Sequence, residues 1–314
     1  MIGRPVGRYR ILERLSPDDA QPLYVGEHVR TKERVWIELP VHSDGGARPH
    51  RDEFLGQAEG AMRLSGRHHF VTVRDYDVEG ELAYLVLDVP DGKPLRQVFA
   101  PATGHPAQAT LVGEVARALG DALDFAHRQG LVLRSLGSDR VAVAADGQVS
   151  VTTLGVTGYP TGTVSPAATG IESLAYLSPE QLRGRDVDAR SDVYAMAVVL
   201  YELLTGRRPY EADTVAALIE RHVYWPLPLP RELNPDLTEA AQWALLKGLA
   251  KHPDDRCATA RELTTDILAG LGLPADASER AGQRWLRLRS AEARQDWDEV
   301  ADIAEELAAL AAAR

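Results

Sequence analysis

The sequence predicts an α+β chain made of a β-rich lobe, a following α-helical lobe and a helical hairpin at the C-terminal end. Residues 1–89 contain short apolar or alternating runs of strand length, separated by polar turns. Residues 90–272 carry apolar positions at helical spacing over longer stretches. A Pro/Ala/Ser-containing linker at 273–278 then precedes two further helical stretches in 279–314. We therefore expect two lobes, a linker and a hairpin with these boundaries.

The first lobe is expected to hold five strands around one helix. The helix has Phe54, Ala58, Ala61 and Met62 near one face, as an amphipathic helix requires. The strands are bounded by polar, glycine- or proline-containing turns. The predicted strands are 9–15, 23–28, 34–39, 71–76 and 82–87, and the predicted helix is 50–64.

The second lobe is expected to be a bundle of long helices with one long loop. Residues 155–168 are rich in glycine, threonine and proline, too irregular for a strand or helix, and long enough for a functional loop. The predicted helices are 111–128, 191–205, 237–250 and 259–269, followed in the hairpin by 279–294 and 298–313.

Composition limits the classes of function. Hydrophobic residues make up 45% of the 314 residues and charged residues 26%, which is typical of a folded chain. The net charge of -11 disfavours binding to nucleic acid and to anionic lipid, because both need a surplus of basic residues. We therefore expect protein partners, with no nucleic acid and no membrane.

The single cysteine, Cys257, excludes an intrachain disulfide and fits a reducing compartment. The N-terminal residues lack the apolar stretch of a signal peptide, and no apolar run reaches the roughly 18 residues of a membrane span. We therefore expect a cytoplasmic protein.

Four motifs in the second lobe occur in a specific order. They are residues 175–182 (AYLSPEQL), 191–194 (SDVY), 201–206 (YELLTG) and 251–256 (KHPDDR). This series closely resembles bacterial Ser/Thr protein kinases, and the resemblance covers about residues 7–271. It implies the two-lobed protein kinase fold, with a β-rich N-lobe and an α-helical C-lobe.

The resemblance also implies structural roles for three residues. Glu180 would pair with Arg256 inside the C-lobe, and Asp192 would hold the backbone of the catalytic loop from below. All three side chains are of the type that the family uses.

The phosphate-binding positions differ from the family. Kinases cover the ATP phosphates with a glycine-rich loop, because only glycine lets the backbone approach so closely. The matching residues 15–24 (LSPDDAQPLY) contain no glycine, and Ser16, Asp18 and Gln21 stand in this loop. We expect a solvated acidic turn here.

The residues that grip and orient the phosphates also differ. The family's V-A-I-K motif reads Val35-Trp36-Ile37-Glu38, so a carboxylate replaces the lysine. Gln57 stands in place of the helix glutamate that would pair with that lysine. The ion pair is therefore missing at both ends.

The catalytic loop and the metal-binding motif are changed as well. The H-R-D-L-x-x-x-N pattern appears as residues 133–140 (LRSLGSDR), with Leu133, Ser135 and Arg140 in place of the histidine, the base and a magnesium ligand. The D-F-G motif reads TLG, with Thr153 in place of the aspartate. A hydroxyl and a cation cannot hold Mg²⁺ as a carboxylate and an amide do.

These differences predict a pseudokinase that is not an enzyme. A positioned general base contributes roughly 10² to 10⁴ in rate, and charge stabilisation of the phosphoryl group on the order of 10³ to 10⁵. We therefore expect a scaffold or allosteric regulator in bacterial Ser/Thr kinase signalling, with an active Ser/Thr kinase or its substrate as candidate partner. We expect no cofactor, no metal and no Mg-ATP.

Two other functions were weighed. A nucleotide-sensing pseudokinase would bind ATP without metal. An enzyme with other nucleotide chemistry would still need a metal and a phosphate cradle, and the sequence offers neither.

Three further patterns have competing interpretations. Asp121, Asp124 and His127 share one helix at metal-ligand spacing, but the family resemblance makes them the surface and end of that helix. Thr169 is a candidate phosphoacceptor with Arg134 as its phosphate anchor, and the alternative is an unmodified loop. The hairpin loosely resembles one tetratricopeptide unit, which must pack on the C-lobe or on another chain because it cannot bury its own apolar face.

Two predictions concern the cleft itself. Glu38 should lie near a cation, with Arg140 as the leading candidate, because a buried unpaired carboxylate is costly. Trp36 should fill the space of the adenine ring above the small Ala142, since interiors avoid voids. The alternative is that Trp36 turns outward and covers the surface of its strand.

Overall fold

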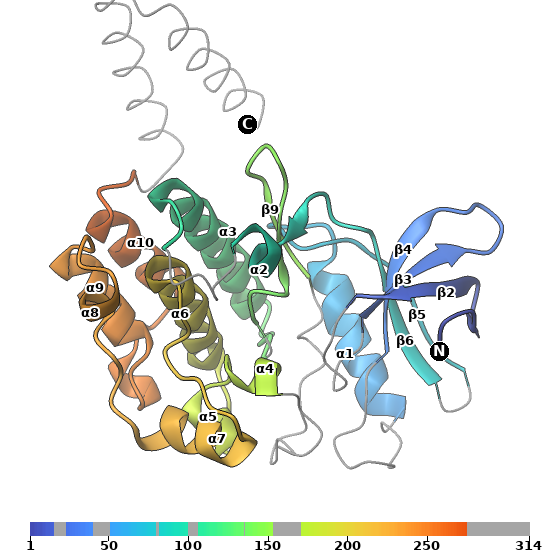
Figure 1. Ribbon diagram of the computed structural model, residues 1–314. Coiled ribbons are helices and arrows are strands. Elements are labelled where there is room, and N and C mark those ends of the chain that lie inside the picture. The colour runs from blue at the N-terminus through green and yellow to red at the C-terminus, as the bar shows by residue number, and fades with distance from the viewer. Residues whose placement is uncertain are drawn as a thin grey trace, which may run out of the picture.

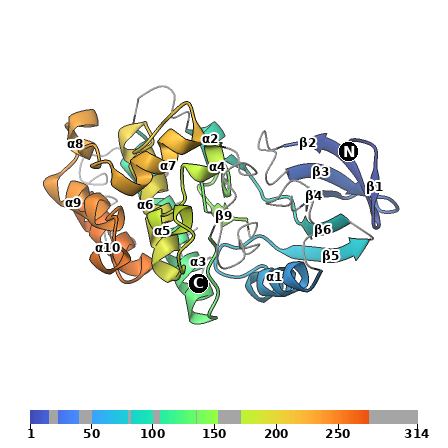
Figure 2. The same ribbon diagram turned by 90° about the horizontal axis from the view of Figure 1, so that it is seen from below.

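The computed structural model describes residues 1–15, 23–39, 51–79, 82–99, 106–134, 136–152 and 171–274. In this part a β-sheet lobe and a helical lobe lie next to each other (Figure 1), and the view from below separates the two (Figure 2). The predicted protein kinase fold, a curled β-sheet N-lobe with a helical C-lobe, is confirmed. The predicted hairpin at 279–314 lies outside the described residues. Among the described helices, none combines the length and the apolar character needed to cross a membrane.

The N-lobe is an antiparallel sheet of six strands in the order β1-β2-β3-β4-β6-β5. Side chains alternate between its two faces, so Trp36 and Leu87 share one apolar cluster, while Ile37 and Val86 share another on the opposite face. Helix α1 contacts β5 and β6. The elements are β1 (Pro5–Val6), β2 (Tyr9–Arg14), β3 (Leu23–His28), β4 (Arg34–Glu38), α1 (Arg51–Leu64), β5 (Val73–Glu79) and β6 (Leu82–Leu87).

The C-lobe is built around helix α6 (Ala189–Thr205), whose residues from Ser191 to Thr205 are all buried. A small sheet of order β7-β8-β9 lies at the side of this lobe that faces the N-lobe (Figure 1). The remaining elements are β7 (Lys93–Pro94), α2 (Leu95–Val98), α3 (Ala109–Arg128), β8 (Val141–Val143), β9 (Val149–Val151), α4 (Ile171–Leu174), α5 (Pro179–Leu182), α7 (Val215–Tyr224), α8 (Pro230–Leu233), α9 (Glu239–Gly248), a 3₁₀ helix (Pro253–Asp255) and α10 (Ala260–Gly270).

Helix α7 was not predicted from the sequence. It begins at a Thr214 cap, whose side chain accepts a hydrogen bond from the amide of Ala217. Only Leu218, His222 and Val223 of its residues are buried, so the apolar stripe that signals an amphipathic helix is incomplete.

Backbone hydrogen bonds and a shared core join the two lobes. The amide of Val71 donates to the carbonyl of Val151 over 2.9 Å, and the amide of Val151 donates to the carbonyl of His69 over 2.7 Å. One cluster of buried apolar side chains includes Trp36 in β4 and Leu119 in α3. The lobes therefore share a continuous core.

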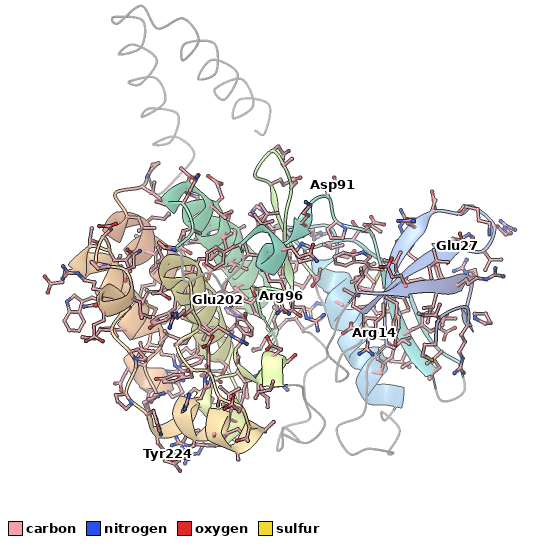
Figure 3. All side chains as sticks on the ribbon, in the orientation of Figure 1. Arg14, Glu27, Asp91, Arg96, Glu202 and Tyr224 are labelled. Carbon is pink, nitrogen blue, oxygen red and sulfur yellow. The ribbon has the colours of Figure 1, made fainter. Side chains whose placement is uncertain are left out.

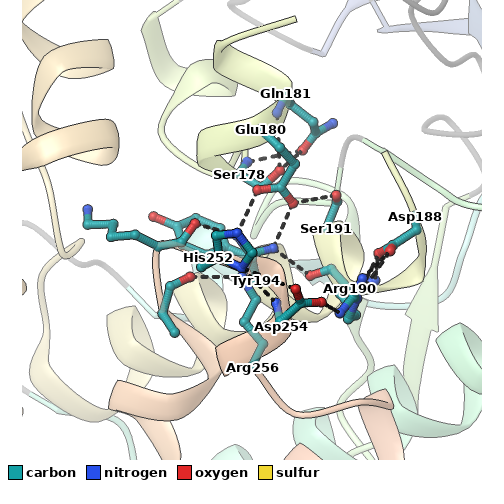
Figure 4. Close-up of polar contacts among 12 residues, drawn as sticks. Ser178, Glu180, Gln181, Asp188, Arg190, Ser191, Tyr194, His252, Asp254 and Arg256 are labelled. Carbon is teal, nitrogen blue, oxygen red and sulfur yellow. Dashed lines mark hydrogen bonds and ion pairs between the residues drawn. The ribbon is translucent and has the colours of Figure 1, made fainter. Parts of the chain in front are cut away.

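A buried ion pair fixes α5 against the segment before α10 (Figure 4). Arg256 donates from Nη1 and Nη2 to the two carboxylate oxygens of Glu180 over 2.6 and 2.7 Å, and Ser191 donates to Glu180 Oε1 over 2.6 Å. The guanidinium of Arg256 also lies 4.9 Å from the centre of the Tyr194 ring. Burial alone would raise the pKa of Glu180, but the hydrogen bonds and charge of Arg256 hold it below the ordinary value.

We predict that Arg256→Met is strongly destabilising, because it leaves Glu180 as a buried charge without its main partner. Breaking such a pair on one side costs about 3–5 kcal/mol, whereas replacing both partners by apolar residues of similar volume is often close to neutral. Urea unfolding of Arg256→Met should therefore show a large loss, and Glu180→Leu/Arg256→Met should recover most of it. A double variant as unstable as the single one would contradict this account.

Candidate functional site

Strand β4 places two unusual side chains on the face of the sheet that looks toward the C-lobe. Trp36 pairs with Leu87 of β6, and Glu38 pairs with Leu85. Because side chains alternate along a strand, Trp36 and Glu38 point to the same face, and Ile37 between them points to the other. Trp36 has 8% of its surface exposed and Glu38 has none.

Trp36 belongs to the core that the two lobes share. Its burial rules out the alternative in which the indole turns outward and covers the surface of the strand. Ala142, its expected neighbour, is buried in β8 opposite Pro94 and Ser150. Contact between Trp36 and Ala142 stays a prediction.

Glu38 is a buried carboxylate without a hydrogen-bond partner for either oxygen among the described residues. Burial raises its pKa to about 7, and the positive charge of Arg140 acts in the opposite direction. The predicted neighbour is therefore close enough for its charge to act on Glu38. However, Arg140 forms no hydrogen-bonded ion pair with Glu38 in the described part of the chain; its Nε lies 3.5 Å from Asp139 Oδ2.

The loop that carries the expected catalytic positions is held by α6. Asp192 accepts hydrogen bonds from the amides of Leu133 and Arg134, each over 2.8 Å, and its Oδ2 lies 2.8 Å from His127 Nε2. Asp192 therefore occupies the supporting position that the resemblance implied. Leu133 is buried, and Arg134 has a left-handed backbone with φ of 65°.

Several predicted positions lie beyond what the structure describes. Gln57 lies in α1, but its side chain is not described. The candidate phosphoacceptor Thr169 and its loop lie outside the described residues. The same holds for Ser16, Asp18, Gln21, Ser135 and Thr153.

The three side chains of the alternative metal site on α3 are hydrogen-bonded to other residues. Asp124 accepts hydrogen bonds from the amide and Nε of Arg261, and Asp121 accepts one from Nη2 of the same side chain. His127 instead contacts Asp192. These three residues therefore serve as contacts between α3, α6 and α10.

A second group of potential metal ligands was not noticed in the sequence. Ligand atoms of Cys257, Glu262 and Asp266 lie within 4.8 Å of one another. Burial raises the pKa of the Cys257 thiol to about 11, so the thiolate that a metal needs is disfavoured. Lys247 binds Glu262 over 2.5 Å. This chemistry does not favour a metal ion.

The sequence reasoning also missed a buried polar group in the C-lobe. Tyr176 donates to Glu202 over 2.8 Å, and its hydroxyl lies 2.7 Å from that of Ser138. Burial raises the pKa of Glu202 above its ordinary value, against the hydrogen bond from Tyr176. Figure 3 shows Glu202 within the helical lobe and Arg96 toward the sheet lobe. A single carboxylate inside the apolar run of α6 was the sequence signal for this group.

Comparison with known proteins agrees with this architecture. The family model described as "Protein kinase domain" matches residues 57–267. The kinase domain of PknI from Mycobacterium tuberculosis, as a C20A_R136A double mutant, superposes with a TM-score of 0.69 at 22% identity, over 87% of this chain and 99% of that one. This likeness concerns the fold.

Curated relatives carry kinase names. Serine/threonine-protein kinase Pkn1 of Myxococcus xanthus is 32% identical over 265 residues, covering 82% of this chain and 38% of the relative. Serine/threonine-protein kinase PrkC of Bacillus subtilis is 28% identical over 271 residues, covering 85% of this chain and 41% of the relative. The chain thus spans about two fifths of the length of these relatives.

The expectation that the chain is not an enzyme is wrong. The kinase domain is present, and the relatives are named serine/threonine-protein kinases, which points to an enzyme class. That expectation rested on the combined replacement of the catalytic base, the lysine and the metal ligands, whereas the family match extends over residues 57–267. With a family model that matches residues 57–267, the chain belongs to the protein kinase family.

Proposed function

We propose that this member of the kinase family acts as a regulator or scaffold in bacterial Ser/Thr kinase signalling, through contacts with protein partners. Contacts with proteins would carry its role. The observation behind the proposal is the cleft: Trp36 lies in the core shared by the lobes, and Glu38 stands where the family has its phosphate-binding lysine. The proposal does not depend on the absence of phosphoryl transfer, which a kinase assay on the same protein measures directly.

The charge of the cleft supports this proposal. Glu38 supplies none of the positive charge with which a lysine would attract phosphates, and in its ionised form it repels them in a site where water is excluded. The loop at 15–24 offers no glycine for close backbone contact with phosphate. Mg-ATP is therefore a poor ligand for this site.

The core shared by the two lobes is a second observation that supports the proposed regulatory function. In a kinase, a bound nucleotide lies between the lobes and contacts both. Here buried apolar side chains of β4, β6, β8 and β9 already belong to one cluster. The arrangement of the lobes is thus stabilised without a ligand, which suits a domain that presents a fixed surface.

The partner would be a protein, with an active Ser/Thr kinase or its substrate as the leading candidate. The curated relatives are named bacterial serine/threonine-protein kinases, and this supports the choice of partner. The net charge of -11 disfavours nucleic acid and anionic lipid as partners.

An alternative function is the binding of ATP without a metal ion. Arg140 occupies the position of a magnesium ligand in the family, and its side chain is buried. A guanidinium there supplies positive charge of the kind that a metal would bring to phosphate oxygens. This alternative keeps the regulatory role and adds nucleotide as its signal.

We predict that ATP with Mg²⁺ leaves the melting temperature unchanged, because the phosphate site carries a carboxylate. Thermal unfolding with ATP, with ATP and EDTA, and with ATP and Mg²⁺ measures this. In parallel, the chain is expected to form a complex with an active bacterial Ser/Thr kinase and to change its rate on a peptide substrate.

A rise in melting temperature that requires Mg²⁺ would overturn the prediction about the site. A rise with ATP in EDTA would favour the alternative function. The absence of both a complex and a rate change would contradict the regulatory role.

We predict that Trp36→Ala destabilises the chain by about 3–5 kcal/mol, because it removes the largest side chain from the shared core. The matched control is Trp243→Ala, since Trp243 is 59% exposed, and it should change stability by less than about 1 kcal/mol. Urea unfolding of both variants gives the two values. The cavity left by Trp36→Ala should also allow adenosine to stabilise the variant measurably, an effect that the unchanged chain lacks. If Trp36→Ala and Trp243→Ala lose equal free energy of unfolding, the buried role of Trp36 is refuted.

We predict that Glu38 makes the chain less stable as the pH rises. Its pKa is about 7 in the folded chain and 4.5 in an exposed carboxyl, so the folded state binds the proton more tightly. The resulting contribution is fully present below about pH 4.5 and is lost as the pH rises through 7, with a span of roughly 3 kcal/mol.

Glu38→Gln removes this titration. Urea unfolding at pH 5, 6, 7 and 8 should show the variant gaining stability relative to the unchanged chain toward pH 8. The control Glu232→Gln, at an exposed position on α8, should show no such trend. A constant difference between Glu38→Gln and the unchanged chain across these pH values would show that Glu38 keeps one protonation state.

A further inference from the structure

A basic pocket lies on the C-lobe, away from the cleft. It has a volume of about 540 Å³ and lies between the end of α5 and the 3₁₀ helix before α10. Figure 4 shows part of its wall, including Arg190, His252 and Asp254. Its lining includes the basic residues Arg183, Arg185, Arg190 and Lys251, together with His252. The volume is within the range of sites that bind small ligands or single side chains.

Most of the carboxylates around this pocket are already engaged. Glu180 is bound by Arg256 on both oxygens. Asp254 is bound by Arg190 over 2.5 Å, and Arg190 also pairs with Asp188 over 2.8 Å. The remaining lining carboxylate, Asp186, is exposed.

Two exposed arginines are left without a carboxylate. Neither Arg183 nor Arg185 has an ion pair with any residue in the described ranges, and both side chains are solvent-accessible. Arg183 lies over the Tyr224 ring, with its guanidinium carbon 5.2 Å from the ring centre. The pocket therefore carries two guanidinium groups whose charge no described acid neutralises.

Lys251 adds a half-buried positive charge to the same wall. Its Nζ lies 2.8 Å from the Tyr210 hydroxyl and donates to the carbonyls of Arg221 and His222 over 3.1 and 2.5 Å, all of them neutral groups. Burial lowers its pKa to about 8, and the like charges of Arg183 and Arg256 act in the same direction. Lys251 thus lies close enough to Arg183 for the two like charges to repel each other, and an anion between them would reduce this repulsion.

Exposed aromatic side chains lie beside the pocket. Tyr224 is 74% exposed at the end of α7, at the lower edge of the helical lobe in Figure 3, and the adjacent Trp225 is 48% exposed. Aromatic side chains with arginine neighbours are typical of surfaces that bind protein partners. This surface suits a peptide better than a free ion, since a free ion would use only the cations.

We propose that this pocket binds a phosphorylated serine or threonine side chain on a protein partner. The guanidinium groups of Arg183 and Arg185 would each donate hydrogen bonds to the oxygens of a phosphate dianion, and Tyr224 and Trp225 would contact the flanking peptide. This inference rests on the proposed regulatory function and names the surface and the partner chemistry for it. A phosphate monoester fits better than a single carboxylate because it carries more negative charge and more acceptor oxygens for the two guanidinium groups that form no ion pair with a described residue.

The test is the binding of labelled peptides by fluorescence anisotropy. The probe is a peptide with one central phosphothreonine between alanine and tyrosine residues, made also in unphosphorylated and glutamate forms. We expect the phosphorylated form to bind at least tenfold more tightly than either of the others. Arg183→Gln/Arg185→Gln should lower that affinity at least tenfold.

The matched control is Arg207→Gln/Arg231→Gln, which removes two exposed arginines of the same lobe outside the pocket. It should bind the phosphopeptide as the unchanged chain does, and melting temperatures check that both double variants are folded. Inorganic phosphate at millimolar concentration should compete only weakly.

Equal binding of the three peptide forms, or full binding by Arg183→Gln/Arg185→Gln, would overturn the proposal. Competition by inorganic phosphate at the affinity of the phosphopeptide would do the same, because it would leave no role for the aromatic surface. If the phosphopeptide fails while the chain still forms a complex with an active kinase, the pocket assignment falls and the proposed regulatory function stands.

Discussion

Asp192 lies at the start of α6 with no exposed surface, and its carboxylate receives the amides of Leu133 and Arg134. A carboxylate at this depth is stable only because these donors and His127 replace its lost water. The three contacts tie the end of α3, the loop after it and the central helix to one another. The position of this loop determines where the residues of the expected catalytic loop lie on the C-lobe side of the cleft.

The same contacts hold an unfavourable backbone. Arg134 keeps a φ of 65°, a region that residues other than glycine rarely occupy. The carbonyl of Arg134 also accepts a hydrogen bond from Gln181 Nε2 over 2.6 Å. Hydrogen bonds to the two peptide units that flank Arg134 therefore stabilise a turn that the free chain would avoid.

The sequence predicted the parts of the fold that follow from periodicity. The strand expected at 34–39 is present as β4, and the motif order correctly brought Glu180 to Arg256 across the C-lobe. Which acid a basic side chain contacts was less predictable, because other acidic residues nearby compete for the same side chain. Arg140 was expected near Glu38, and its charge does act on that carboxylate. Its Nε nevertheless lies 3.5 Å from Asp139 Oδ2, and no hydrogen bond joins it to Glu38 among the described residues.

Other features were missed because their signal is spread over distant residues. The hydrogen bonds among Ser138, Tyr176 and Glu202 join three segments, and no window of the sequence contains all of them. Lys251 and Arg183 meet in the same way, through the folding of α5 and the segment before α10. Glu180 and Arg256 are structural residues of the C-lobe that keep the family's type. The chemistry of the cleft depends on different residues, so the structural residues can be kept while the cleft residues change.

The core that runs through both lobes limits how the molecule can move. Separating the lobes would uncover apolar surface around Trp36, and a buried aromatic side chain alone accounts for about 200 Å². At about 25 cal/mol per Å², exposing the whole of such a side chain would cost roughly 5 kcal/mol, and this is the upper limit for Trp36 because its own lobe also covers it. A binding partner would meet a rigid domain. Little affinity would be lost, because the domain already populates mainly one conformation.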